Sequence, residues 1–490
     1  MGRKAMLLAG VFLAPLMVAA APGTAHAGDI RITPSVEVGQ TYTDNVRLSP
    51  TNRQSDWVQS VSPKLQLERT GPRLNLNVTG GVDYLYFDKL NKDDIRPNVL
   101  GTASYIAVPD FLKFDANVEV RKTLVDPAGG FTISPYNDTP NRETLQLYSA
   151  GPTLFHHFGP IADAQVTYTF SYANVNNVQF IQGAQSGGLN HDYVHDVVAD
   201  VTSGPRFTRF QWDINGEYIH STFQQAGAGA LGRISRDQYI ARFTGNYIVN
   251  YWFALIATAG YDHISTSNNP QGVFPLQGGP SWSAGFELKG SRSDIRITAG
   301  HRFGGFSMDA SGRYDISPRL TLTAAYTDEI TTSVRRLTAL LNLAAANSFA
   351  STFGLDPRFT LSDEYFRSRR GSLTLSGTRG RNTMSIDGFV DRRSYRILPQ
   401  GDWIYGVQGT FDRQLNRKWT LNLLGLYTYQ HFNNFQFRRD DIYAASAGVT
   451  DQFARSLSAS VTYRFSYRNS SDPTIDAKEN AVTLLLTATF

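Results

Sequence analysis

Apolar and polar residues alternate along most of this chain. In residues 161–172, IADAQVTYTFSY, one face is apolar and the other carries Asp163, Gln165, Thr167, Thr169 and Ser171. Residues 74–86, 112–121, 419–429 and 457–467 repeat the pattern. A period of two over ten or more residues predicts β-strands. These strands are longer than the five or six residues that are usual in soluble proteins.

Two kinds of connection separate the predicted strands. Short turns follow every second strand, at Gly71-Pro72, Pro109-Asp110, Gly159-Pro160, Gly204-Pro205 and Ser317-Pro318. Longer loops rich in Gly, Asn and Pro lie between them, at residues 124–141, 176–190, 224–234, 267–280 and 333–362. Short turns on one side and long loops on the other are typical of bacterial transmembrane β-barrels. We therefore predict a single all-β domain over residues 28–490, an antiparallel up-and-down barrel of about 22 strands (range about 20–24) with both termini periplasmic.

The two faces of the predicted strands differ in chemistry. One face is aliphatic, with aromatic residues toward the strand ends, whereas the other carries isolated charges. A secreted β-sandwich also alternates, but hairpins of this length would need a very large core. A closed sheet with lipid outside and a wet lumen inside satisfies both faces. The residues that we expect to line the lumen are Lys113, Asp115, Glu119, Arg121, Asp387, Asp391, Arg393, Arg464 and Arg468.

Tryptophan positions agree with a membrane-spanning barrel. Trp57, Trp282 and Trp403 fall where descending strands would begin, and Trp252 and Trp419 fall where ascending strands would begin. This distribution predicts two aromatic belts, one at each membrane–water interface.

The chain ends inside a strand pattern. Val482, Leu484, Leu486, Ala488 and Phe490 are apolar at alternate positions. We expect this last strand to pair with the first and close the cylinder. A terminal aromatic residue behind alternating apolar residues resembles the signal read by the barrel-assembly machinery, here Phe490, Ala488, Leu486 and Leu484.

The first 27 residues predict export. Arg3 and Lys4 precede a short apolar run, and Ala25-His26-Ala27 forms an A-x-A cleavage site, so we expect a cleaved signal peptide over residues 1–27. The chain contains no Cys, which excludes disulfides and a lipidated N-terminal cysteine. The net charge of +4 falls further when Arg3 and Lys4 leave, so charge gives no argument for nucleic-acid binding.

Residues 32–50, ITPSVEVGQTYTDNVRLSP, carry a family resemblance. Pro34, the segment Tyr42–Val46, Ser55-Asp56 and a second strand ending near Pro63–Leu65 are similar to those of outer-membrane β-barrel proteins associated with exopolysaccharide and exosortase (PEP-CTERM) loci. The resemblance covers about 35 residues and implies a role near polysaccharide secretion. It carries no catalytic residues over to this chain.

No constellation predicts catalysis, a cofactor or a metal. In HDYVHD, His191 and His195 would converge on a helix, but on a strand they lie about 13 Å apart, too far to share an ion. They are expected near the headgroup rim, while His156 and His157 precede a short turn. The sequence contains no P-loop, dinucleotide-binding fingerprint or zinc spacing.

Arginines gather near the predicted extracellular ends, either as a basic mouth for an anionic solute or as contacts for lipopolysaccharide phosphates. The set is Arg335, Arg336, Arg358, Arg367, Arg369, Arg370, Arg392, Arg393, Arg396, Arg438 and Arg439. Val334, Leu337, Leu341 and Ala344 have helical spacing and predict a short helix in loop 333–362. This helix is expected either to enter the barrel mouth or to pack on neighbouring loops.

These patterns lead to a functional hypothesis. We expect a non-enzymatic barrel of the bacterial outer membrane acting as a passive, porin-like conduit in exopolysaccharide secretion. The alternatives are a closed scaffolding barrel and, third, a lipid- or polysaccharide-modifying enzyme. The few residues between Gly28 and the first strand argue against a TonB-dependent receptor with a plug domain. Expected partners are outer-membrane lipid and lipopolysaccharide, the barrel-assembly machinery and polysaccharide secretion components, with no nucleic acid.

Overall fold

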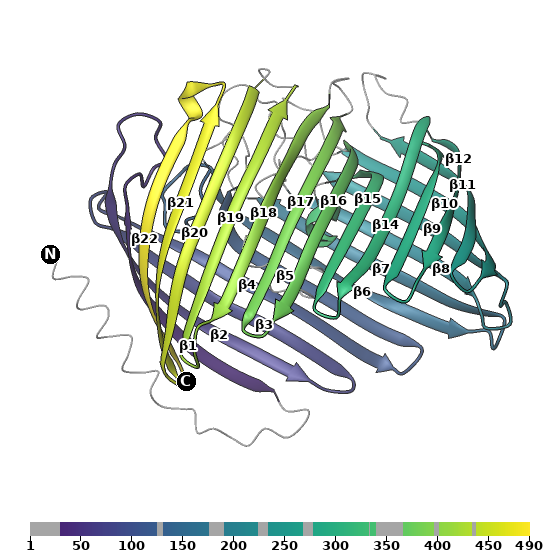
Figure 1. The fold of residues 1–490 in the computed structure, drawn as a ribbon, viewed down its shortest axis with the longest axis horizontal. Coiled ribbons are helices and arrows are strands. Elements are labelled where there is room, and N and C mark those ends of the chain that lie inside the picture. Colours follow the sequence, from purple (N-terminus) through teal and green to yellow (C-terminus); the bar gives the residue numbers. More distant parts are fainter. Residues whose placement is uncertain are drawn as a thin grey trace.

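A computed structural model describes residues 30–124, 131–175, 191–223, 234–267, 278–332, 334–339, 366–395, 401–433 and 438–490. These residues form one closed sheet of 22 antiparallel strands, tilted along the wall of a barrel (Figure 1). The predicted fold class and strand number are confirmed. None of the helices in the described residues is long and apolar enough to cross a membrane.

The strands follow one another around the barrel in chain order. Their bounds are β1 Arg31–Thr43, β2 Asp56–Thr70, β3 Leu74–Phe87, β4 Lys92–Val108, β5 Leu112–Leu124, β6 Arg142–His157, β7 Ala162–Val175, β8 Asp192–Ser203, β9 Phe210–Phe223, β10 Ile234–Asn250, β11 Phe253–Thr266, β12 Gly279–Lys289, β13 Ser293–Arg302, β14 Gly305–Ser317, β15 Leu320–Thr331, β16 Phe366–Arg379, β17 Asn382–Tyr395, β18 Asp402–Gln414, β19 Trp419–Phe432, β20 Arg438–Ala454, β21 Leu457–Ser470 and β22 Ala477–Thr489.

The barrel closes where β1 pairs with β22. Ser35 lies opposite Thr489 and Thr43 lies opposite Ala481. The backbone N–H of Phe490 donates to the carbonyl of Pro34 at 2.9 Å. The start of β1 and the end of β22 therefore lie at one end of the barrel, which is the end that carries the short turns.

Alternation along each strand separates a lipid-facing surface from a lumen-facing surface. On β22, Val482, Leu484 and Leu486 are exposed, whereas Glu479 and Thr483 in the other phase of the strand are buried. Apolar side chains face outward because lipid surrounds the barrel, and polar side chains face inward, where hydrogen-bonding groups surround them. The residues of the predicted C-terminal signal, Phe490 included, follow the outward phase.

The two ends of the barrel differ as the sequence predicted. The predicted short turns all join strands at the end that holds the termini, and Gly159 and Gly380 adopt a φ of +62° in two such turns. Positive φ is a conformation that glycine adopts without strain. The long connections lie at the opposite end, which we call the extracellular end. Trp57, Trp282 and Trp403 begin descending strands there.

Candidate functional site: the barrel lumen

All nine residues expected in the lumen lie in the phase opposite to the exposed apolar side chains of their strands. On β5, Lys113 pairs with Asp115 at 2.9 Å and Glu119 pairs with Arg121. On β21, Arg464 donates to the hydroxyl of Thr483 at 2.9 Å. Because these charges are largely satisfied by one another, they do not form a wall of one sign.

Two buried carboxylates near the extracellular end organise the remaining lumenal arginines. Asp391 accepts from Arg393 at 3.0 Å and from the hydroxyl of Ser368 at 2.8 Å. Asp440 accepts from Arg468 at 2.6 Å and from Arg438 at 3.0 Å. Buried ions need such partners because removal from water costs several kcal/mol per ion.

A short helix over residues 334–339, here called the lumen helix, packs on the inner wall of the barrel. Its Val334 and Leu337 are each 2% exposed. They join an apolar cluster with inward residues of four strands: Leu145 and Leu147 of β6, Ala173 and Val175 of β7, Val194 of β8 and Ile219 of β9. This inward apolar patch is the docking surface of the helix.

The lumen helix is also tied to two separate parts of the wall by charge. Arg335 donates to Asp196 of β8 at 3.3 Å and to Glu217 of β9. Arg336 lies 3.2 Å from Asp391 of β17 and donates to Ser368 of β16 at 3.2 Å. Burial lowers the pKa of Arg336 to about 10, so it is still cationic at neutral pH.

The two anchoring walls are far apart around the barrel, because β10–β15 separate β9 from β16. The lumen helix therefore bridges the interior between them. The sequence predicted a helix in loop 333–362, and residues 334–339 form one; residues 333 and 340–362 lie outside the described residues. Of the two predicted placements, the described part takes the one inside the barrel.

A second segment, residues 131–141 between β5 and β6, also turns into the lumen; we call it the seam loop. Thr132 donates to the buried carboxylate of Glu479 on β22, which also accepts from Thr43 at 2.7 Å. Phe131 packs against Ile442 and Ala444 of β20. The seam loop thus covers the inner wall where the barrel closes.

Two arginines hold the other half of the seam loop. Arg96 donates to the carbonyl of Asn137 at 2.8 Å, and Arg142 donates to the carbonyl of Ser134 at 3.0 Å. Tyr136 packs on the inward apolar residues Val46, Val58, Leu85 and Phe87. The sequence did not predict this segment, because loop residues lack the alternating pattern that shows whether a side chain faces the lumen.

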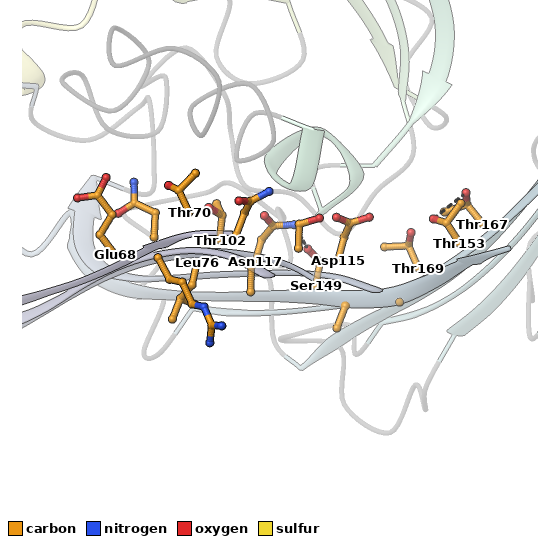
Figure 2. A pocket seen from close by; sticks show the side chains of 17 residues that line it. Glu68, Thr70, Leu76, Thr102, Asp115, Asn117, Ser149, Thr153, Thr167 and Thr169 are labelled. Atoms are coloured by element: carbon orange, nitrogen blue, oxygen red, sulfur yellow. Dashed lines mark hydrogen bonds between the residues drawn. The ribbon is translucent and has the colours of Figure 1, made fainter. Parts of the chain in front are cut away.

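Toward the periplasmic end, β2–β7 line a cavity of about 700 Å³. Its wall is rich in hydroxyls and amides, and Asn117 donates to Ser149 at 3.2 Å. In Figure 2 the side chains of Thr70, Asn117 and Asp115 point to the side of the wall on which the short helix lies. The lining also includes the charged residues Glu68, Arg69 and Asp115, so the cavity is polar.

The predicted extracellular arginines do not form one rim. Arg335, Arg336 and Arg438 are held inside the barrel by carboxylates. Arg367 pairs with Asp328 at 2.6 Å, Arg369 lies 3.5 Å from the same carboxylate, and Arg370 stacks over Phe389 at 5.8 Å. Arg439 is exposed in the outward phase of β20. Arg358 and Arg396 lie outside the described residues.

The histidine motif lies on the outer wall. His195 Nδ1 hydrogen-bonds to the hydroxyl of Tyr168 at 2.8 Å, and His191 Nδ1 to Tyr172 at 2.7 Å. Within the described residues, no group of three His, Cys, Asp or Glu side chains is placed to hold a metal ion. Asp196, the last residue of this motif, faces the lumen and pairs with Arg335 at 3.3 Å.

Comparison with solved structures finds similar barrels among outer-membrane receptors. It is similar to the ferric-catecholate import receptor Fiu from E. coli K12, with a TM-score of 0.52 and 9% identity over 95% of this chain and 82% of that one. The siderophore receptor PiuA from Acinetobacter baumannii also gives a TM-score of 0.52, with 9% identity over 96% of this chain and 82% of that one. At this identity the likeness shows the fold. No family model and no curated protein matches the chain.

These matches confirm a barrel of the bacterial outer membrane and correct the functional prediction. The expected passive, porin-like conduit for exopolysaccharide is wrong, because the matched barrels are receptors for particular ligands and the lumen helix crosses the interior. The resemblance of residues 32–65 to proteins of polysaccharide loci stays a prediction.

Proposed function

We propose that this protein is a receptor-type transport barrel that takes up a particular ligand and is not an enzyme. The observation that carries the proposal is the lumen helix, which is anchored on β8–β9 by Arg335 and on β16–β17 by Arg336. A segment docked across the interior restricts passive flow through the barrel. A barrel that admits one ligand needs such a segment, because ligand binding can then favour the undocked state.

The ligand class proposed from the structural neighbours is a ferric siderophore, of which Fiu imports the catecholate type. The long extracellular connections are the natural place for its first contact, since loops on a rigid scaffold carry binding residues. The lumenal cavity below the helix, lined by hydroxyl and amide groups, supplies a polar route once the helix has moved.

Two measurements on the refolded protein test this proposal. A ferric catecholate siderophore should quench tryptophan fluorescence saturably, whereas the same siderophore without iron should bind more weakly. In a planar bilayer the protein should show little conductance at rest. Absence of saturable binding would remove the ligand class, and a steady large conductance would remove the gated-receptor proposal as a whole.

A further inference from the structure

The outer wall carries a basic row that the lumen does not use. Arg369, Arg392, Trp403, His431 and Arg439 lie directly opposite one another on β16, β17, β18, β19 and β20. Trp403 is 39% exposed and Arg439 is also exposed, which fixes the row on the lipid-facing side. Neighbouring strands are about 4.8 Å apart, so the row extends about 19 Å along the wall.

The row lies at the height of lipid headgroups. Two residues further into the wall, Tyr405 and Tyr429 stack with ring centroids 4.8 Å apart, and Tyr427 and Tyr443 follow at 5.1 Å. The next outward side chain after Tyr405 on β18 is aliphatic Val407, which lies opposite Tyr427. Aromatic belts mark the membrane–water interface. Cations immediately above such a belt face the phosphates of the outer leaflet.

Two cations of the row lack an internal counter-ion. Arg392 and Arg439 make no ion pair with any carboxylate of the described residues within 4.0 Å, whereas Arg369 lies 3.5 Å from Asp328. The Nε of Arg392 is buried without a hydrogen-bond partner there, while its guanidinium stacks at 5.2 Å over Trp403. The outward acid nearest to Arg439 on its strand is Asp441, which accepts from the Tyr427 hydroxyl at 2.8 Å.

The opposite side of the barrel is different. Near the extracellular ends of β8, β9, β11 and β13, the outward phase carries His195, His220, His263 and His301 in place of arginine. The arginine row therefore has no counterpart on these four strands, whereas a general attraction to membrane phosphate would call for cations around the whole wall.

We propose that the row of Arg369, Arg392, Trp403, His431 and Arg439 binds the phosphorylated sugar headgroup of one outer-leaflet glycolipid. Arginine binds phosphate through two parallel hydrogen bonds, and the planar Trp403 ring holds Arg392 in place for that contact. Arg392 and Arg439 are about 14 Å apart by strand spacing, so they reach two separate phosphates on a disaccharide-sized headgroup. The acyl chains lie on the aliphatic wall below.

Lipid retention by the detergent-purified protein, followed by native mass spectrometry, tests this proposal. The probes are bis-phosphorylated lipid A, the same lipid after phosphatase treatment, and phosphatidylglycerol. The variant Arg392→Ala/Arg439→Ala should weaken binding of bis-phosphorylated lipid A at least about tenfold, because it removes two charged hydrogen-bond donors to phosphate. Its binding of the dephosphorylated lipid should not change. Arg47→Ala/Arg53→Ala, which removes two exposed arginines elsewhere at the same end, should bind all three lipids as the wild type does.

Further variants separate recognition from folding. Trp403→Ala should weaken lipid A binding several-fold, while Trp282→Ala, an exposed tryptophan on the histidine side, should not. If the alanine variant does not fold, Arg392→Lys/Arg439→Lys keeps both charges and should still lose several-fold affinity. Equal affinity of the row variants and the matched controls would overturn the proposal, as would phosphatidylglycerol binding as tight as lipid A.

Discussion

Replacement of Arg335 by alanine should open the barrel. Arg335 is the cation that joins the lumen helix to Asp196 and Glu217, whose side chains are 21% and 16% exposed. Breaking a fully buried ion pair costs about 3–5 kcal/mol, and partial exposure reduces this to about 2 kcal/mol here. A cost of that size moves the balance between docked and undocked helix about 30-fold toward undocked.

The assay is single-channel recording of the refolded protein in a planar bilayer. Wild type should be mostly silent, and Arg335→Ala should show a large increase in the open fraction at the same voltage. Arg335→Lys keeps the charge and should lie between the two. Arg313→Ala removes an arginine that is 62% exposed from its pair with Asp315 near the periplasmic end, so it should behave as wild type.

Two results would refute this reasoning. If Arg335→Ala and a deletion of residues 334–339 are both as silent as wild type, the lumen helix is not the barrier. If wild type conducts as strongly as Arg335→Ala, the helix leaves a pore beside it and does not gate.

Three other changes give separate tests. Leu337→Ala removes a side chain that is 2% exposed and should weaken helix docking by about 2–4 kcal/mol, seen as faster trypsin cleavage after Arg336, whereas lipid-facing Leu373→Ala should not. Asp440→Asn leaves buried arginines with a neutral partner and should destabilise the barrel by about 3–5 kcal/mol in urea unfolding; an unchanged midpoint would contradict this. Phe490→Ala should reduce insertion by reconstituted assembly machinery while refolding in detergent stays normal; equal loss in both assays would mean a purely structural role.

The barrel itself was predictable because the residue pattern of each strand determines which of its side chains face lipid and which face the lumen. Alternation fixes which side chains face lipid, and this phase placed Asp391, Arg393, Arg464 and Arg468 in the inward phase before any pairing was known. Turn lengths then fixed which end is which. Such information is local, so a single sequence carries it completely.

The contents of the lumen were not predictable in the same way. Arg335 meets Asp196 and Glu217 across 139 and 118 positions of the chain. No periodicity connects residues that far apart, and the motif around Asp196 drew attention to its histidines instead. Likewise, no pattern in residues 131–141 predicts that the Thr132 hydroxyl donates a hydrogen bond to Glu479 near the C-terminus. The prediction of a passive conduit failed because the sequence left the placement of the helix in loop 333–362 open and gave no sign of the carboxylates that hold it across the interior.

The arginines near the extracellular end have two different roles, which depend on the face of the barrel that each side chain occupies. Arg438 and Arg439 are neighbours in sequence, yet strand alternation turns the first inward to Asp440 and the second outward to the lipid. Arg393 and Arg392 divide in the same way, with Arg393 on Asp391 and Arg392 over Trp403. The inward member of each pair satisfies a buried carboxylate, so its loss should lower stability. The outward member has no such role, so its loss should leave unfolding unchanged and alter only lipid binding.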